Sequence, residues 1–193
     1  AGAQLAMMGD AEQTGVFLEK MADFFRYNVR KMEEDAYLRE EIEAVDNYIY
    51  ILNVRFAGDI HYRKEIDEDI ENIRIPSMIL QPMVENAVQH GIHDCMETGW
   101  IRMSIHRNHD MTEVIVQDNG VGMTEEQIRS IYEDFRENKS SGNHIGIRNI
   151  YRRLSLYYHN DLKFEFYNMD PGLKIFISLP GGDDDNEIYN GNR

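Results

Sequence analysis

The segment LQPMVENAVQHGI, residues 80–92, carries polar side chains whose spacing could do chemistry. If it is helical, Asn86 and His90 lie one turn apart and point the same way, with Glu85 beside them and an apolar arc opposite. Asn has poor helix propensity, so it is a less routine choice here than Lys or Glu. An amide oxygen and a carboxylate are ligands for a hard cation such as Mg²⁺. An ordinary amphipathic helix with a solvated polar face is the alternative interpretation.

A second candidate site is DNGVGM, residues 118–123, which directly follows a predicted strand. The Asp118 carboxylate, at the end of a buried strand, is well placed to accept a hydrogen bond from the exocyclic amine of a base. Gly120 and Gly122 lack Cβ atoms and would let a flat ring approach the backbone. The dinucleotide fingerprint GxGxxG is not matched, because its third glycine and its βαβ context are missing. A tight turn remains the simpler alternative.

The third candidate is GNHIGI, residues 142–147, where a polar loop meets the start of a predicted helix. Backbone N–H groups at a helix N-terminus bind phosphate, and Gly142 and Gly146 supply the conformational freedom. Lys139 or Arg148 could add positive charge. A plain loop-to-helix junction is the alternative. An acidic protein that binds a polyphosphate needs such local phosphate-binding groups and a metal ion, because its net negative charge repels the ligand.

The composition narrows the classes of function. The 193 residues carry a formal charge of 20 − 35 = −15, which argues against nucleic-acid binding and against an anionic membrane surface. With 42% apolar residues, the chain can build a core. The single cysteine, Cys95, excludes an internal disulfide and suits a reducing compartment. The first residues lack the pattern of a signal peptide and open in mid-pattern, so we expect a piece of a longer protein.

The first third of the chain predicts two consecutive amphipathic helices. A first stripe contains Leu18, Met21, Phe25 and Met32. The second stripe is sharper, with members spaced 4, 3, 4, 3 and 4 residues apart: Leu38, Ile42, Val45, Ile49, Leu52 and Phe56. A helical hairpin or one arm of a dimeric bundle would produce this pattern. A helix packed on the core of its own domain would produce it equally well.

The rest of the chain predicts a mixed α/β unit. We expect strands over 60–66, 101–106, 112–117, 162–167 and 173–179. We expect helices over 75–91, from a Thr124–Gln127 capping box onward, and over 147–158. Strict β-α-β alternation is absent, so the fold class is α+β, a two-layer α/β sandwich. The expected domains are a helical segment (1–58), a catalytic domain (59–180) and an acidic disordered tail (181–193).

The order of the three candidate sites resembles the ATP-binding domain shared by sensor histidine kinases, DNA gyrase, Hsp90 chaperones and MutL, and within it the LytS/YesM-type histidine kinases. The matching stretches are LQPMVENAVQHGI (80–92), VQDNGVGM (116–123) and HIGIRNIYRRL (144–154). Upstream, FFRYNVRK (24–31), LREEIEAVDNYIYILNVRF (38–56) and the IP at 75–76 resemble the segment that precedes this domain in such kinases. The resemblance implies a Bergerat-type fold with a mixed sheet.

The resemblance also implies a role for each matching residue. Asn86 would ligate a Mg²⁺ ion that bridges the phosphates of ATP, and His90 would contact phosphate. Asp118 would accept the amino group of adenine. The lid over ATP would run from about Phe135 to Asn143. The remaining nucleotide-binding positions are Gly120, Gly122, Met123, Lys139, Gly142, His144, Ile145, Gly146 and Ile147.

Three departures from the family pattern stand out. Related ATPases have a water-activating glutamate four residues before the metal-binding Asn, where this chain has Pro82; Glu85, adjoining Asn86, is the remaining catalytic candidate. The absence of a glutamate at position 82 fits phosphate transfer better than ATP hydrolysis. His144 stands where the family usually has a second glycine, and Gly172-Leu173 stands where a Gly-Thr pair is frequent.

The implied function is the catalytic part of a two-component sensor histidine kinase. The phosphoacceptor His of this subfamily lies in a Pro-His-Phe motif, which this chain lacks, so the acceptor would lie upstream. The implied partners are a response regulator receiver domain and a second copy, bound through upstream helices. The parent would be anchored in the cell membrane, with this part in the cytoplasm. Alternatives are a gyrase- or Hsp90-like ATPase and a degenerate nucleotide-binding or dimerisation module.

Overall fold

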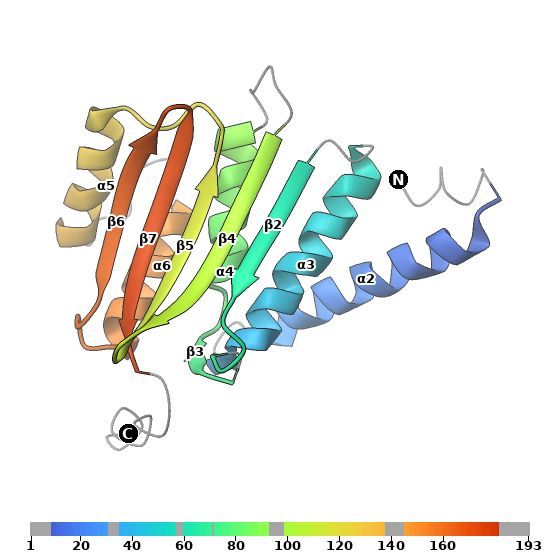
Figure 1. Cartoon of the computed structure of the whole chain (residues 1–193), viewed down its shortest axis with the longest axis horizontal. Helices are drawn as coiled ribbons and strands as arrows, with labels where there is room; N and C mark the ends of the chain where they lie inside the picture. The colour runs from blue at the N-terminus through green and yellow to red at the C-terminus, as the bar shows by residue number, and fades with distance from the viewer. Residues whose placement is uncertain are drawn as a thin grey trace.

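The computed structural model describes residues 9–30, 35–56, 60–70, 72–92, 99–137 and 145–181. Its helices, shown in Figure 1, are α2 (Ala11–Arg30), α3 (Leu38–Arg55), α4 (Leu80–Asn86), the π-helix η1 (Ala87–Ile92) that continues α4, α5 (Glu125–Glu137) and α6 (Ile145–Tyr157). Its strands are β1 (Asp35–Tyr37), β2 (Ile60–Ile66), β3 (Arg74–Pro76), β4 (Gly99–Asn108), β5 (Met111–Asp118), β6 (Lys163–Met169) and β7 (Gly172–Pro180).

The main sheet has five strands in the order β2-β4-β5-β7-β6. Strands β2 and β4 are parallel, and the other three pairs are antiparallel. Helices α4 and α6 lie behind the sheet in Figure 1, and α3 and α2 follow beyond β2. The predicted α+β class, with a mixed sheet in two layers, is confirmed.

One apolar core joins the sheet to the helices. Alternate residues of β5 are buried, because only one face of that strand packs against helices. The core includes Met83 and Val84 of α4 and Ile147 and Leu154 of α6. The apolar residues of the predicted strand and those of the stripe on the last helix therefore pack in the same core.

Helix α3 belongs to that core as well. The first four members of its stripe, from Leu38 to Ile49, are at most 5% exposed and lie in the same cluster as the sheet residues. Leu52 is partly buried, and Phe56 is 37% exposed. The structure thus supports the interpretation that this helix packs on its own domain. Helix α2 lies along α3, with the Phe24 ring stacked on Tyr48 at 6.0 Å between centroids.

The prediction of a helix over 75–91 is wrong at its start. Ile75 and Pro76 lie in β3, which pairs with β1, and the chain bends at Ser77–Ile79 before α4 begins. Ile75 precedes a proline, which disfavours helical backbone there, and its side chain is 1% exposed. At the other end, the helical backbone continues in η1 through Gly91 to Ile92, one residue beyond the predicted limit.

Several local predictions are confirmed. Strand β2 has the predicted limits. The Thr124 hydroxyl accepts from the Gln127 amide at 3.2 Å, and the Gln127 side chain accepts from the Thr124 amide at 2.7 Å, which is the predicted capping box. Strands β6 and β7 lie where strands were predicted over 162–167 and 173–179, and the turn between them contains Pro171.

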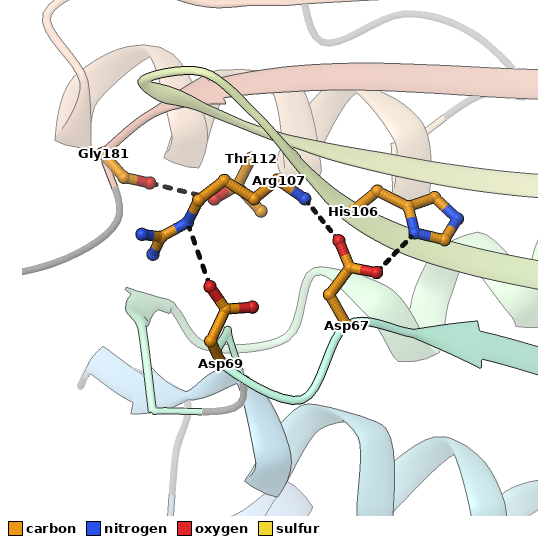
Figure 2. Close-up of polar contacts among 6 residues, drawn as sticks. All are labelled: Asp67, Asp69, His106, Arg107, Thr112 and Gly181. Carbon is orange, nitrogen blue, oxygen red and sulfur yellow. Dashed lines mark hydrogen bonds and ion pairs between the residues drawn. The ribbon is translucent and has the colours of Figure 1, made fainter.

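A polar cluster holds the chain after β2 against β4 (Figure 2). The Asp67 carboxylate accepts from the Arg107 amide at 2.9 Å and lies 3.1 Å from Nδ1 of His106. Asp69 lies 3.8 Å from Nε of Arg107, and the Thr112 hydroxyl donates to a carbonyl just beyond β7. This cluster lies at the opposite end of β5 from Asp118, so it stabilises the fold far from the candidate site.

Candidate functional site

A cavity lies between α4 and the sheet, at the end of β5. Its walls come from α4 and η1, β5, the loop after β5, and β7: Asn86, Ala87, Val116, Asp118, Gly122, Met123, Leu173 and Ile175. The predicted metal ligand, Asn86, and the predicted base-binding carboxylate, Asp118, therefore share one cavity. The side chains between them on the sheet are apolar, which suits a flat ring better than a strongly solvated ligand.

Asp118 is a buried carboxylate held in a defined orientation. The residue is 4% exposed, and its Oδ1 accepts from the Gly120 amide at 2.8 Å. Burial raises the pKa of the Asp118 carboxyl, and the amides of Gly120 and Leu173 oppose that rise. A buried acceptor beside apolar walls can recognise one amino group on a planar ligand. The next residue, Asn119, accepts from the Trp100 amide at 2.7 Å, which ties the loop to β4.

The loop after Asp118 is clamped from the β6–β7 hairpin. Both atoms of the Asn168 amide bond Met123: Oδ1 accepts from its N–H at 2.9 Å, and Nδ2 donates to its carbonyl at 2.5 Å. Gly122 has φ +66°, and a Cβ there would lie 3.0 Å from the Gly172 carbonyl oxygen. Gly172 has φ +112°, and a Cβ there would lie 1.9 Å from the Asp118 carbonyl oxygen. Sequence reasoning did not find the role of Asn168, and no local pattern marks it.

Asn86 is the last residue of α4, immediately before the change to π-helix, a change that is frequent at functional sites. Its Nδ2 donates to the Pro82 carbonyl at 2.7 Å. A metal ion would be bound through the other side-chain atom, Oδ1. A Cβ on Gly146 would lie 3.5 Å from Asn86 Nδ2, so the first turn of α6 lies against Asn86. The third predicted segment therefore meets the first.

The start of α6 can offer backbone groups to a ligand. Ile145 is 56% exposed, whereas Ile147 is 1% exposed and packs in the core. Any contact of Ile147 with a ligand would therefore use its backbone amide, not its side chain. Lys139, Gly142 and His144 lie outside the described residues, as does the side chain of His90.

The first residues of the predicted lid lie at the end of helix α5. Residues 135–137 belong to helix α5, and the Phe135 ring stacks on Tyr151 at 3.9 Å between centroids. The aromatic cluster between α5, α6 and β6 holds this ring, so the described start of the predicted lid packs against the rest of the domain. Residues 138–143 lie outside the described part of the chain.

Glu85 lies on the face of α4 that is directed toward α2. Its Oε1 accepts from Gln81 Nε2 at 2.8 Å, and the same Nε2 lies 3.3 Å from Asn28 Oδ1 of α2. Among the described residues that line the cavity, Glu85 does not occur. Its predicted catalytic role stays a prediction.

The described residues contain no group of three or more His, Cys, Asp or Glu side chains that could hold a metal ion. A metal at Asn86 would therefore complete its coordination with ligand phosphates and water, as Mg²⁺ commonly does. The residues present fit a magnesium nucleotide: a buried acceptor and apolar walls at one end, and an amide oxygen beside a helix N-terminus at the other.

Two family models match the chain. The model described as histidine kinase-, DNA gyrase B-, and HSP90-like ATPase matches residues 72–182. The chain belongs to this family. A second model, histidine kinase, matches residues 2–60. Both models together cover most of the chain and agree with the resemblance inferred from the three motifs.

Named relatives are sensor kinases. The sensor histidine kinase YpdA of Escherichia coli is 30% identical over 161 residues, which are 83% of this chain and 27% of YpdA. The sensor protein LytS of Oceanobacillus iheyensis is 29% identical over 173 residues, which are 89% of this chain and 30% of LytS. The chain thus spans less than a third of the length of these relatives.

Solved structures show the same fold. The catalytic domain of the histidine kinase ThkA superposes with a TM-score of 0.55 at 22% identity, over 77% of this chain and 95% of that domain. The histidine kinase domain of the blue-light activated kinase of Erythrobacter litoralis superposes with a TM-score of 0.54 at 15% identity, over 92% of this chain and 79% of that one.

Among helices in the described ranges, none has the apolar length that a bilayer requires.

Proposed function

We propose that this chain is the catalytic part of a sensor histidine kinase that binds Mg-ATP. Its task is to present the γ-phosphate to a histidine upstream of this chain, from which the phosphate passes to an aspartate of a response regulator. The observation that carries the proposal is that Asn86 and Asp118 line one cavity. Family membership supports it, because histidine kinases share this ATP-binding domain.

At the base end, Asp118 accepts the exocyclic amine of adenine. Val116 and Ile175 form apolar walls against which a purine can pack. The backbone at Gly122, which has no Cβ, allows the ring to approach the loop. The loop is already held by Asn168, so little ordering is required when the nucleotide binds.

At the phosphate end, Asn86 Oδ1 holds the metal and the first amides of α6 bind phosphate oxygens. Bound Mg²⁺ supplies the positive charge that offsets charge on the transferred phosphoryl group. The role of the chain is positioning, because phosphoryl transfer needs little covalent help from the protein. A chain with a net charge of −15 needs such local attraction to hold a polyphosphate.

The proposed partners are a response regulator and a second copy of the parent protein. A structure of ThkA in complex with the response regulator TrrA superposes on this chain with a TM-score of 0.52. It supports a response regulator as a partner. Leu18, Phe25 and Val29 of α2 are 58%, 56% and 76% exposed and lie on one side of the helix, which supports contact with another helix. We place this part in the cytoplasm, below a parent anchored in the membrane.

Calorimetry with ADP tests the proposal. The wild-type chain should bind ADP, and Asp118→Asn should reduce the affinity about 100-fold, because an amide replaces the buried acceptor. Asp110→Asn, in the exposed β4–β5 hairpin, is the matched control and should bind normally. Unchanged affinity in Asp118→Asn would contradict the adenine role.

The alternatives predict other results. A degenerate module would give no heat with ADP and Mg²⁺. A gyrase- or Hsp90-like ATPase would turn over ATP steadily as the isolated chain. The kinase should instead transfer label from γ-labelled ATP to the histidine of its longer parent protein.

A further inference from the structure

A buried carboxylate lies where α2, α3 and the start of α4 meet, outside the cavity described above. Glu41 of α3 is 0% exposed. Its Oε2 accepts from the amides of Ile79 at 2.9 Å and Leu80 at 2.8 Å. Its Oε1 accepts from the Met78 amide at 2.5 Å and from the Tyr27 hydroxyl of α2. Four donors thus converge on one carboxylate, which offsets the cost of removing it from water.

Three of these donors are the backbone amides at the start of α4, and the fourth is the Tyr27 hydroxyl. The N-cap residue of α4 is Ile79, whose side chain makes no capping bond, so Glu41 supplies from another helix the acceptor that Ser or Asp usually supplies. Met78 has φ 62°, a left-handed conformation that non-glycine residues rarely adopt. The bond from Glu41 to the Met78 amide therefore stabilises an otherwise unfavourable bend and sets the direction in which α4 starts.

The direction of α4 determines the place of Asn86. Asn86 ends this short helix, six residues after Leu80 and about 9 Å along the axis. The same bend also contacts α6, since Arg153 donates to the Ser77 carbonyl. Because the first turn of α6 lies against Asn86, a shift of the bend would change both the amide and the helix N-terminus beside it.

Two consecutive residues link α2 to this arrangement. Burial and the Glu41 carboxylate raise the pKa of Tyr27, so its hydroxyl keeps the proton that it donates. Asn28 Oδ1 accepts from Gln81 Nε2 of α4 at 3.3 Å, and Gln81 is 2% exposed. Helix α2 therefore contacts α4 directly through Asn28 and indirectly through Glu41.

We propose that Glu41 is a positioning residue for Asn86, and that Tyr27 makes this positioning depend on the place of α2. The inference rests on the proposed function, because it takes Asn86 as the metal ligand. When α2 moves away, the buried carboxylate loses one donor and the start of α4 shifts. The metal-bound phosphates then lose affinity, while the base end, which is held by the sheet, does not.

The ratio of ADP affinities with Mg²⁺ and with EDTA separates the two ends of the site. We expect Glu41→Gln to lower this ratio about tenfold, because the amide replaces one charged acceptor oxygen by a donor that faces other donors. Tyr27→Phe should lower it severalfold. The affinity in EDTA should fall less than the affinity with Mg²⁺ in both variants. Glu43→Gln and Tyr50→Phe, on the same helix α3 but without bonds to α4, are the matched controls.

Each outcome decides between the proposals. Equal losses with and without Mg²⁺ would mean that Glu41 only stabilises the fold, and no loss under either condition would mean that it does not position Asn86; either result overturns this inference alone. If Glu41→Gln fails to fold, Tyr27→Phe decides, since it removes a single hydroxyl. A wild-type chain that binds ADP without any effect of Mg²⁺, or does not bind ADP, would overturn the proposed function as well.

Discussion

The two ends of the cavity are held in different ways. The base end is held from the sheet: the Asn168 side chain of β6 bonds the loop after Asp118, and Asp118 packs against Gly172 of the neighbouring strand β7. The phosphate end lies at the last residue of a short helix whose start is held by the side chain of Glu41. We infer that the base end is rigid, and that the phosphate end can respond to movements of the helices beside it.

Of the variants that test how the two ends are held, one at Gly172 should have the largest effect on stability and ADP binding. Gly172→Ala would place a Cβ 1.9 Å from the Asp118 carbonyl oxygen at φ +112°, so backbone must move. We expect a loss of stability on the order of 2–4 kcal/mol and loss of ADP binding. Thermal unfolding and calorimetry measure the two effects.

Gly181 is the matched control for this substitution. It has φ +92°, with no atom within 4 Å of an added Cβ, so Gly181→Ala carries the backbone strain without the collision. It should lose about 1 kcal/mol and keep ADP binding. Equal effects in the two variants would show that close packing at Gly172 does not hold the base end.

Asn86→Ala should affect only the phosphate end. We expect the affinity for ADP with Mg²⁺ to fall to the affinity measured in EDTA, because the metal loses its protein ligand. The affinity in EDTA should stay within about twofold of wild type. Gln89→Ala, an exposed position on η1, is the control. A large loss in EDTA would show that the two ends are not independent.

Asn168→Ala should loosen the base end without changing any residue of the cavity wall. Two hydrogen bonds to Met123 are lost, so we expect the ADP affinity to fall about tenfold, equally with and without Mg²⁺. Calorimetry under both conditions measures this. A loss confined to the Mg²⁺ condition would contradict the separation of the two ends.

The smallest expected effect is a pH dependence of base binding. Because burial raises the pKa of Asp118, this carboxyl becomes protonated at a higher pH than an exposed aspartate does. A protonated carboxyl no longer accepts freely, so the affinity for adenosine, which has no phosphate, should fall severalfold as the pH is lowered from 7 toward 5. In Asp118→Asn the weaker binding should not change over this range; a parallel decrease there would assign the effect to another group.

Much of the fold could be predicted because its signals are local. The alternation in β5, the stripes of α3 and α6, and the capping box at Thr124 all depend on residues within a few positions of one another. The three motifs were also predicted to meet in one site. For the described residues, the cavity and the contact of Gly146 with Asn86 agree with that prediction.

The errors occurred where distant contacts decide the local structure. Ile75 and Pro76 lie in a strand because β1 offers a pairing partner forty residues earlier in the chain. Phe135, at the start of the predicted lid, lies in α5, where Tyr151 and Phe164 pack around its ring. Pro76 is a local signal against a helix at Ile75, but no pattern near either position shows the strand pairing or the ring contacts.

The sequence by itself determined the class of fold, the family and four of the residues that line the cavity, since periodicity and motif order are written along the chain. These four are Asn86, Asp118, Gly122 and Met123. Only the tertiary structure decided that β2 runs parallel to β4, that α3 packs on the domain core, and that Glu41, Asn168 and Gly172 hold the two ends of the site. The physical reason is that a buried carboxylate, a side-chain clamp and a close backbone contact each depend on atoms supplied by distant segments.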